Sequence, residues 1–202
     1  KHGAEIVKTE DWPGFGPQKN RALDRATGEW VLSIDADEVV TPELATAIRA
    51  AISNPDQDAW EISRLSSFCG RWIHHSGWQP DWIVRLFRRG RARFSDHLVH
   101  ESILVPSASI GRLSGKLLHY SYTDFEEVLA KANHYSSLAA AMRLERGEKG
   151  GLTKALAKGF WTFFRTYILR AGFMDGRMGL VLAIYNAETT YYRYLKIMLG
   201  RN

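Results

Sequence analysis

Two carboxylates, one residue apart, follow an apolar run near the start of the chain. The run is Trp30 to Ile34, and the acids are Asp35 and Asp37. A short apolar run of this length is typical of a buried strand, and open α/β sheets bind ligands at the carboxyl ends of their strands. Magnesium is commonly held by one or two carboxylates together with substrate phosphates. The pattern therefore favours a divalent cation that holds a diphosphate. A loop acid that caps the next helix is the alternative.

Basic side chains precede the acid pair on a short predicted helix. The helix runs from Pro17 to Ala26, and Gly28 is its stop signal. Lys19 and Arg21 lie near its N-terminus, where the helix dipole favours anions rather than cations. A phosphate bound nearby would explain these two cations. An ordinary solvated helix end would explain them equally well.

The middle of the chain alternates strand and helix signals. Thr41 to Glu43 starts a helix, with an N-cap, a first-turn proline and an early acid. Residues 60–63 alternate as a strand does, residues 66–81 form an irregular aromatic-rich loop, and Trp82 to Phe87 is a strand. Short strands are expected at 103–105, 110–113 and 116–118.

Helices dominate the C-terminal part. A capping box of Thr123 and Glu126 starts a long helix. A second helix runs from Thr153 to Leu169, and a turn at 172–176 leads to the last helix. The apolar stripe predicted for the long helix consists of Phe125, Val128, Ala132, Tyr135, Ala139 and Met142.

The positive charge of the chain is concentrated at its C-terminal end. The net charge is +5, yet residues 151–202 alone hold eight Lys or Arg and two acids. Such basic, aromatic helices indicate an anionic partner surface, either a membrane or a nucleic acid. No nucleic-acid-binding motif supports the second, so no nucleic acid is expected. A helical subdomain that packs on the core is the alternative.

A single cysteine, Cys69, rules out a disulfide framework and favours a reducing compartment. No basic-then-apolar leader opens the chain, so no signal peptide is expected. No uninterrupted apolar run reaches the roughly 18 residues that span a bilayer. The expectation is a cytoplasmic protein, peripheral at the inner face of the cell membrane.

Several motifs resemble those of family 2 glycosyltransferases. Residues 14–23 and 26–38 hold the pattern of a Lys-Asn pair that opens a helix, a Gly that ends it, and an apolar strand that leads into Asp-x-Asp. Residues 80–88, 99–101 and 167–180 resemble one subgroup, which contains lipopolysaccharide-core β-glucosyltransferases and related cell-envelope enzymes.

The resemblance implies an α/β chain with a GT-A, Rossmann-like mixed sheet. Residues 1–121 would be the catalytic domain and residues 122–202 a helical, basic C-terminal region. The family's opening strand, helix and strand are missing here, so an N-terminally truncated domain is expected. The implied reaction is inverting transfer of a sugar from a nucleotide-diphospho sugar, with a UDP-sugar favoured, to a cell-envelope glycan or lipid-linked acceptor.

The same resemblance assigns roles to individual residues. It implies Mg2+ or Mn2+ on the donor diphosphate, with Asp35, Asp37 and His119 as ligands. The catalytic base would be Glu101 in the Val-His-Glu motif, or Asp81. Glu101 could instead pair with nearby arginines, and His119 could be structural. The residues expected to contact the donor are Lys19, Asn20, Arg21, Asp35, Asp37 and Arg85.

Other interpretations stay open at this point. Five arginines between 85 and 93 suit a donor phosphate or a phosphorylated acceptor, or they form a solvated basic hairpin. His97, His100 and Glu101 do not follow the helical zinc signature H-E-x-x-H, which argues against a zinc hydrolase. An inactive truncated GT-A-like scaffold, or a basic module that binds nucleic acid or a membrane surface, is the alternative to the enzyme.

Overall fold

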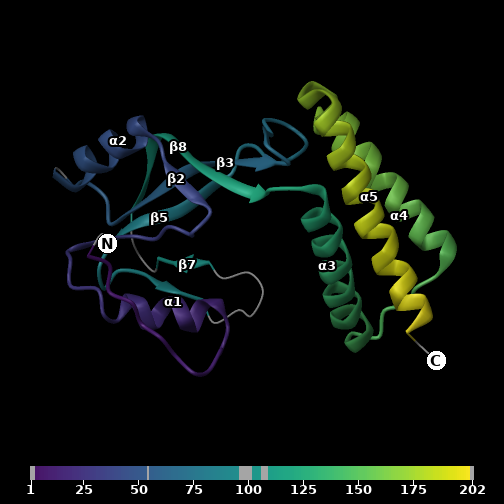
Figure 1. The fold of residues 1–202 in the computed structure, drawn as a ribbon, viewed down its shortest axis with the longest axis horizontal. Coiled ribbons are helices and arrows are strands. Elements are labelled where there is room, and N and C mark those ends of the chain that lie inside the picture. The colour runs from purple at the N-terminus through teal and green to yellow at the C-terminus, as the bar shows by residue number, and fades with distance from the viewer. Residues whose placement is uncertain (1–2, 54, 96–101, 106–108, 201–202) are drawn as a thin grey trace. The chain divides into compact units, whose positions relative to one another are not determined.

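An α/β fold divides into two units in the computed structural model, which describes residues 3–53, 55–95, 102–105 and 109–200 (Figure 1). The first unit takes residues 1–64 and 82–117, and the second takes residues 65–81 and 118–202. Each unit has hydrophobic clusters of its own. The predicted α/β class, with a mixed sheet and C-terminal helices, is confirmed.

A five-stranded path forms the sheet on which the first unit is built. In spatial order the strands are β1 (Trp30–Leu32), β5 (Trp82–Arg88), β3 (Ala59–Phe68), β8 (Ile110–Tyr122) and β2 (Glu38–Val40). Strand β5 is antiparallel to both β1 and β3, with Val31 opposite Phe87. A separate antiparallel pair joins β6 (Arg93–Phe94) to β7 (Ile103–Leu104). Because β1 is an edge strand of the path, the acids that follow it leave the sheet at its border.

Two helices accompany this sheet, α1 (Phe15–Leu23) and α2 (Pro42–Ser53). The predicted start of α2 is confirmed, because the backbone N–H of Leu44 donates to the Thr41 hydroxyl at 3.3 Å. Leu44 is fully buried, in a cluster with Trp60 and Leu117 from β3 and β8. The apolar face of α2 thus packs on the middle of the sheet and fixes where β2 ends.

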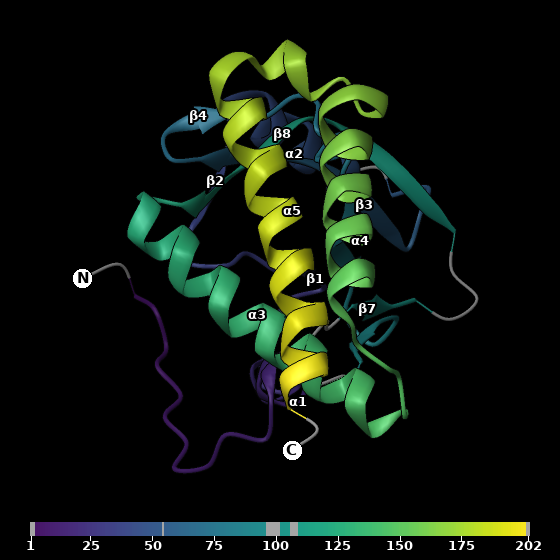
Figure 2. The same cartoon turned by 90° about the vertical axis from the view of Figure 1, so that its right-hand side faces the viewer.

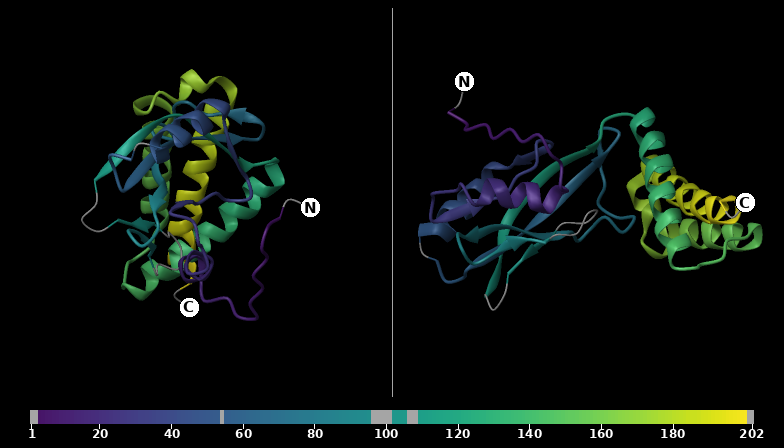
Figure 3. Two further views of the ribbon diagram at one scale, coloured as in Figure 1. Left: turned by 90° about the vertical axis from the view of Figure 1, so that its left-hand side faces the viewer. Right: turned by 90° about the horizontal axis from the view of Figure 1, so that it is seen from below.

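The second unit is mainly helical. Helix α5 (Gly176–Leu199) lies between α3 (Phe125–Glu145) and α4 (Leu152–Phe164) (Figures 2 and 3). A π-helical turn, η1 (Arg165–Leu169), and a 3-10 turn, η2 (Gly172–Asp175), connect α4 to α5. Strand β4 (Arg71–Trp72) pairs with the end of β3. Among the described residues, no helix combines the length and apolar character that crossing a membrane requires.

Three strand predictions need correction. The loop expected at 66–81 begins with regular structure, because β3 continues to Phe68 and turns into β4 through Cys69 and Gly70, both at positive φ (46° and 74°). The strands expected at 110–113 and 116–118 are parts of one 13-residue strand, β8. Strand β2 was not predicted, because three residues between an acid pair and a helix start leave no periodic signal.

The start and face of α3 also differ from the prediction. The N-cap is Asp124, whose carboxylate accepts from the N–H of Glu127 at 2.8 Å, and Glu127 accepts from the N–H of Thr123 at 2.9 Å. The capping box is therefore displaced by one residue. The buried stripe of α3 is Val128, Ala132, Ser136 and Ala140, whereas Phe125, Tyr135 and Met142 are exposed.

Candidate active site

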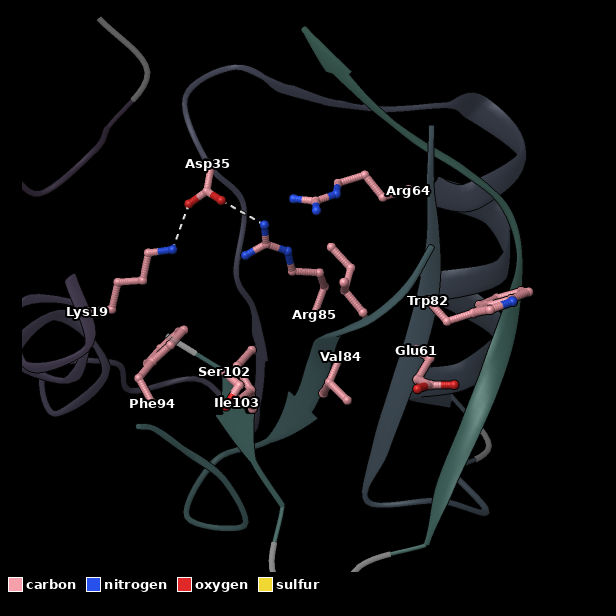
Figure 4. Close-up of a pocket in the computed structure, with 11 residues that line it drawn as sticks. Lys19, Asp35, Glu61, Arg64, Trp82, Val84, Arg85, Phe94, Ser102 and Ile103 are labelled. Atoms are coloured by element: carbon pink, nitrogen blue, oxygen red, sulfur yellow. Dashed lines mark hydrogen bonds and ion pairs between the residues drawn. The ribbon is translucent and has the colours of Figure 1, made fainter. Parts of the chain in front are cut away.

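A cavity of about 440 Å³ opens in the first unit beside the end of β1 (Figure 4). Its charged rim brings together Lys19 of α1, Asp35 after β1, Arg85 of β5 and Arg64 of β3. Figure 4 shows Lys19 and Arg85 pointing at Asp35 from opposite sides. The remaining lining residues are Glu61, Trp82, Ile83, Val84, Phe94, Ser102 and Ile103. The cavity thus gathers its cations at one end, and its walls mix apolar side chains with Glu61 and Ser102.

Each oxygen of the Asp35 carboxylate is held by a different cation. Lys19 Nζ lies 2.8 Å from Oδ1, and Arg85 Nη2 lies 2.7 Å from Oδ2. Burial by itself would raise the pKa of Asp35. The hydrogen bond from Lys19 and the charge of Arg85 outweigh it, so the pKa of this carboxyl lies below its ordinary value. Asp35 is therefore ionised at neutral pH and fixed in orientation.

A second carboxylate, that of Glu38, also holds Arg85 in place. The same Nη2 atom of Arg85 lies 2.7 Å from Oε1 of Glu38, whose side chain is fully buried. Burial alone would lower the pKa of Arg85, but the charges of Glu38 and Asp35 raise it above its ordinary value. Nε of Arg85 is buried without a hydrogen-bond partner in the part of the chain that the structure describes. An unsatisfied buried donor is unusual, and such compromises concentrate at functional sites.

Hydrogen bonds within the turn between β1 and β2 fix the positions of Asp35 and Asp37. The N–H of Asp35 donates to Oε2 of Glu38 at 2.9 Å, and the N–H of Glu38 donates to the carbonyl of Asp35 at 3.0 Å. This reciprocal pair holds Asp37 at the tip of the turn, where it is exposed. One acid thus belongs to an internal ion-pair network, and the other faces solvent.

The site fits a metal ion only if the ligand supplies most of its coordination. Both oxygens of Asp35 already accept from cations, and Asp37 is the more exposed carboxylate of the two. Within the described ranges, no three His, Cys, Asp or Glu side chains group together as a metal site. Magnesium readily uses one or two carboxylates plus substrate phosphates. Metal binding by Asp35, Asp37 and His119 remains a prediction.

Three other predicted residues lie in different surroundings. His119 belongs to the second unit, where its Nδ1 shares a 2.9 Å hydrogen bond with the Ser66 hydroxyl. Asp81 is half-buried and directly precedes Trp82, a wall residue of the cavity. Glu101, the preferred base, lies outside the described residues. The assignment of the base therefore stays a prediction.

Two predicted donor contacts on α1 have other partners in the structure. The side-chain amide of Asn20 is buried, donates to the carbonyl of Phe94 at 2.9 Å and accepts from its N–H at 3.0 Å. It therefore ties α1 to β6. Arg21 forms a two-pronged ion pair with Asp11, at 2.8 and 2.7 Å, on an exposed surface. Of the two cations predicted near this helix start, Lys19 is the one that lines the cavity.

The arginine cluster separates into one site residue and several surface residues. Arg85 lines the cavity. Arg88 lies 3.3 Å from Glu29, and Arg93 lies 3.1 Å from Asp24. The Arg93–Asp24 pair is exposed, as in the solvated basic hairpin that was the alternative to phosphate binding, whereas Arg88 is half-buried.

The chain matches the family model described as Glycosyl transferase family 2 over residues 2–112. It belongs to glycosyltransferase family 2, and its resemblance to that family is confirmed. An uncharacterized glycosyltransferase of Rickettsia typhi is 28% identical over 206 residues, which cover 96% of this chain and 70% of the relative. The lipopolysaccharide core biosynthesis glycosyltransferase LpsC of Rhizobium meliloti is 29% identical over 200 residues, 92% of this chain and 72% of LpsC. The enzyme class, glycosyltransferase, follows from these matches.

Two residues of the site were not predicted from the sequence, Glu38 and Arg64. Arg64 Nη1 lies 3.7 Å from Oε1 of Glu38, so this buried carboxylate faces two arginines. Glu38 is adjacent to the acid pair in the sequence, but its partners come from β3 and β5. Arg64 had no distinct signal in the sequence, because β3 also holds Glu61 and three serines.

Proposed function

We propose that this glycosyltransferase moves a sugar from a nucleotide-diphospho sugar, with inversion, to a cell-envelope glycan or lipid-linked acceptor. Family 2 enzymes use nucleotide-sugar donors, and the donor diphosphate would occupy the cationic end of the cavity. The observation that carries the proposal is the Lys19–Asp35–Arg85 arrangement at the end of β1. A UDP-sugar is the favoured donor.

The charged residues would each have a different role in binding the donor. Lys19 and Arg85 would face the diphosphate, since a planar guanidinium suits phosphate oxygens. Asp35 would keep both cations in position. Asp37 would hold Mg2+ or Mn2+ on the diphosphate, and such a cation offsets the charge that develops on the leaving phosphate.

Inversion by single displacement needs a base that takes the proton of the acceptor hydroxyl. Glu101 is the first candidate and Asp81 the second. The donor sugar would lie along the apolar wall of Trp82 and Val84, where water is partly excluded. An acceptor in the cell envelope would place the enzyme in the cytoplasm at the inner face of the membrane.

The test is a screen of nucleotide-sugar donors that measures released nucleoside diphosphate, with and without Mn2+. We expect one donor class to be turned over and Asp37→Asn to reduce turnover about 100-fold. Asp58→Asn is the matched control, because Asp58 pairs with surface arginines outside the cavity, and it should retain activity. Absence of turnover and binding with every nucleotide-sugar would refute the proposal.

A further inference from the structure

Helix α4 presents its large apolar side chains to solvent and its small ones to the protein. Ala155, Gly159 and Thr166 of α4 and η1 are buried. Gly159 sits so close to α5 that an added Cβ would lie 3.3 Å from the carbonyl oxygen of Ala187 and from Cβ of Tyr191. Small residues are therefore what the packing of α4 on α5 requires.

The opposite stripe repeats at every fourth residue and is apolar throughout. It consists of Leu152, Leu156, Phe160, Phe164 and Ile168, with exposed fractions of 52%, 56%, 71%, 36% and 44%. Residues spaced by four share one face of a helix. An amphipathic helix normally turns such a face toward the core. Here the face lies on the outside of the second unit, where α4 runs beside α5 (Figure 2).

Basic side chains occur on the same helices as this stripe, and Lys154 lies 3.9 Å from Glu148. Residues 149–174 hold five Lys or Arg and no Asp or Glu. Lys154, Lys158 and Arg165 are exposed on α4 and η1, and Trp161 beside them is 50% exposed. An apolar stripe on a helix that also carries several cations and an exposed aromatic ring is typical of helices that lie in a membrane interface.

A shallow groove between α4 and α5 widens the apolar surface. Its volume is about 310 Å³, and Leu156, Phe160, Ala187 and Tyr191 line it. Glu188 of α5 is the acidic side chain at its edge. Helix α5 adds Leu180 and Ile184, which are 38% and 44% exposed. The outer side of both helices therefore offers more apolar area than α4 alone.

We propose that the α4 stripe, from Leu152 to Ile168, is the surface by which the protein lies on an anionic lipid bilayer. The rings and aliphatic chains would enter the boundary between headgroups and acyl chains, and Lys154, Lys158 and Arg165 would reach anionic headgroups. The proposal rests on the proposed function in one respect, because a lipid-linked acceptor would explain why the enzyme binds a bilayer. The binding itself needs neither donor nor acceptor.

The charge of these helices favours an anionic bilayer over two other partners, a second copy of the chain and a nucleic acid. A second copy packed on the same stripe about a two-fold axis would bring two helices together that each carry Lys154, Lys158 and Arg165 and no acid. Nucleic acid would satisfy the cations but leave five large apolar side chains in water. An anionic bilayer meets both the apolar and the charged requirement.

The test is co-sedimentation of the full chain with vesicles of phosphatidylcholine alone or with about one third phosphatidylglycerol. We expect binding to the anionic vesicles, and we expect Leu156→Ser/Phe160→Ser to weaken the partition coefficient about tenfold or more. Both side chains are exposed, so the fold should survive, which circular dichroism checks. Lys158→Gln/Arg165→Gln should reduce the preference for anionic vesicles and its dependence on salt.

The matched control is Leu129→Ser/Met142→Ser on α3, where both residues are similarly exposed, at 44% and 45%. This variant should bind vesicles like the wild type. Equal losses in the two double variants, or no binding to anionic vesicles by the wild type, would overturn the proposal. So would a dimer, seen by light scattering, that Leu156→Ser/Phe160→Ser dissociates while vesicles stay unbound. Activity on a soluble acceptor does not require vesicle binding, so failure of the membrane proposal and failure of the proposed reaction can be told apart.

Discussion

Nη2 of Arg85 lies 2.7 Å from a carboxylate oxygen of Asp35 and 2.7 Å from one of Glu38. One guanidinium nitrogen thus joins a half-exposed acid at the cavity to an acid that is fully buried. The turn that carries both acids is closed by their own backbone hydrogen bonds. The orientation of Asp35 therefore depends on Glu38, whose side chain is fully buried.

Glu38→Ala should destabilise the first unit strongly. The change leaves Arg85, whose side chain is 9% exposed, without its buried partner, and breaking a buried pair from one side costs about 3–5 kcal/mol. Urea unfolding followed by tryptophan fluorescence measures the effect. Glu29→Ala is the control, because the Glu29 side chain is 67% exposed in its pair with Arg88 and pairs at the surface contribute about 0–1 kcal/mol. Similar losses in both variants would contradict the anchoring role of Glu38.

Acid should weaken the network through Asp35. Its pKa in the folded chain lies below the ordinary value of 3.8, so the unfolded chain takes up the proton first as the pH falls. The stability contributed by ionised Asp35 is thus complete above about pH 5 and is lost as the pH drops through the folded-state pKa. Unfolding free energies from pH 6 to pH 3 should differ most between wild type and Asp35→Asn at pH 6. A difference that stays constant down to pH 3 would count against the ion pairs.

Gly115→Ala should be far more damaging than Gly90→Ala. Both glycines have positive φ, at 88° and 82°, which costs an L-residue about 1–2 kcal/mol. An added Cβ on Gly115 would also lie 2.5 Å from the backbone nitrogen of Leu44, whereas Gly90 has nothing within 4 Å. Overpacking of this kind adds about 1–3 kcal/mol. Equal unfolding midpoints for the two variants would show that β8 and α2 do not approach so closely.

Asn20→Ala should loosen the attachment of α1 to β6. It removes both hydrogen bonds to the backbone of Phe94, and each buried group left unpaired costs about 1–3 kcal/mol. Hydrogen exchange at residues 15–23 and at 93–94 measures the effect. Gln18→Ala removes a hydrogen bond to Thr9 on the exposed side of the same helix, and it should leave exchange nearly unchanged. If Asn20 serves ligand binding alone, exchange without ligand will be unaffected in both variants.

Local signals predicted much of the first unit. The apolar run before Asp35 is a strand, and the proline after Thr41 opens a helix, because both depend on neighbours within a few residues. The observed N-cap of α3 is Asp124, one residue after the predicted Thr123. Both residue types can cap a helix, and the sequence does not indicate which of the two does so. The turn at Cys69 was missed, because a non-glycine residue at positive φ has no local signature.

The site was predictable only in part, because its network is assembled from distant segments. Lys19 and Asp35 were found from a local pattern, in which they are only 16 positions apart. Glu38 binds Arg85, 47 residues away, and that pairing depends on the strand order β1–β5–β3. The sequence left open whether the C-terminal helices meet an anionic surface or pack on the core, since periodicity identifies a face without saying what covers it.

The account is tested most directly by equilibrium binding of a nucleoside diphosphate in the presence of Mn2+. Calorimetry on the wild type, Lys19→Gln, Asp37→Asn and the control Asp58→Asn would separate the cavity from the surface. We expect binding by the wild type and Asp58→Asn, and a loss of about tenfold or more in affinity for Lys19→Gln and Asp37→Asn. Unchanged affinity in both cavity variants would contradict a donor diphosphate held between Lys19, Arg85 and the acids after β1.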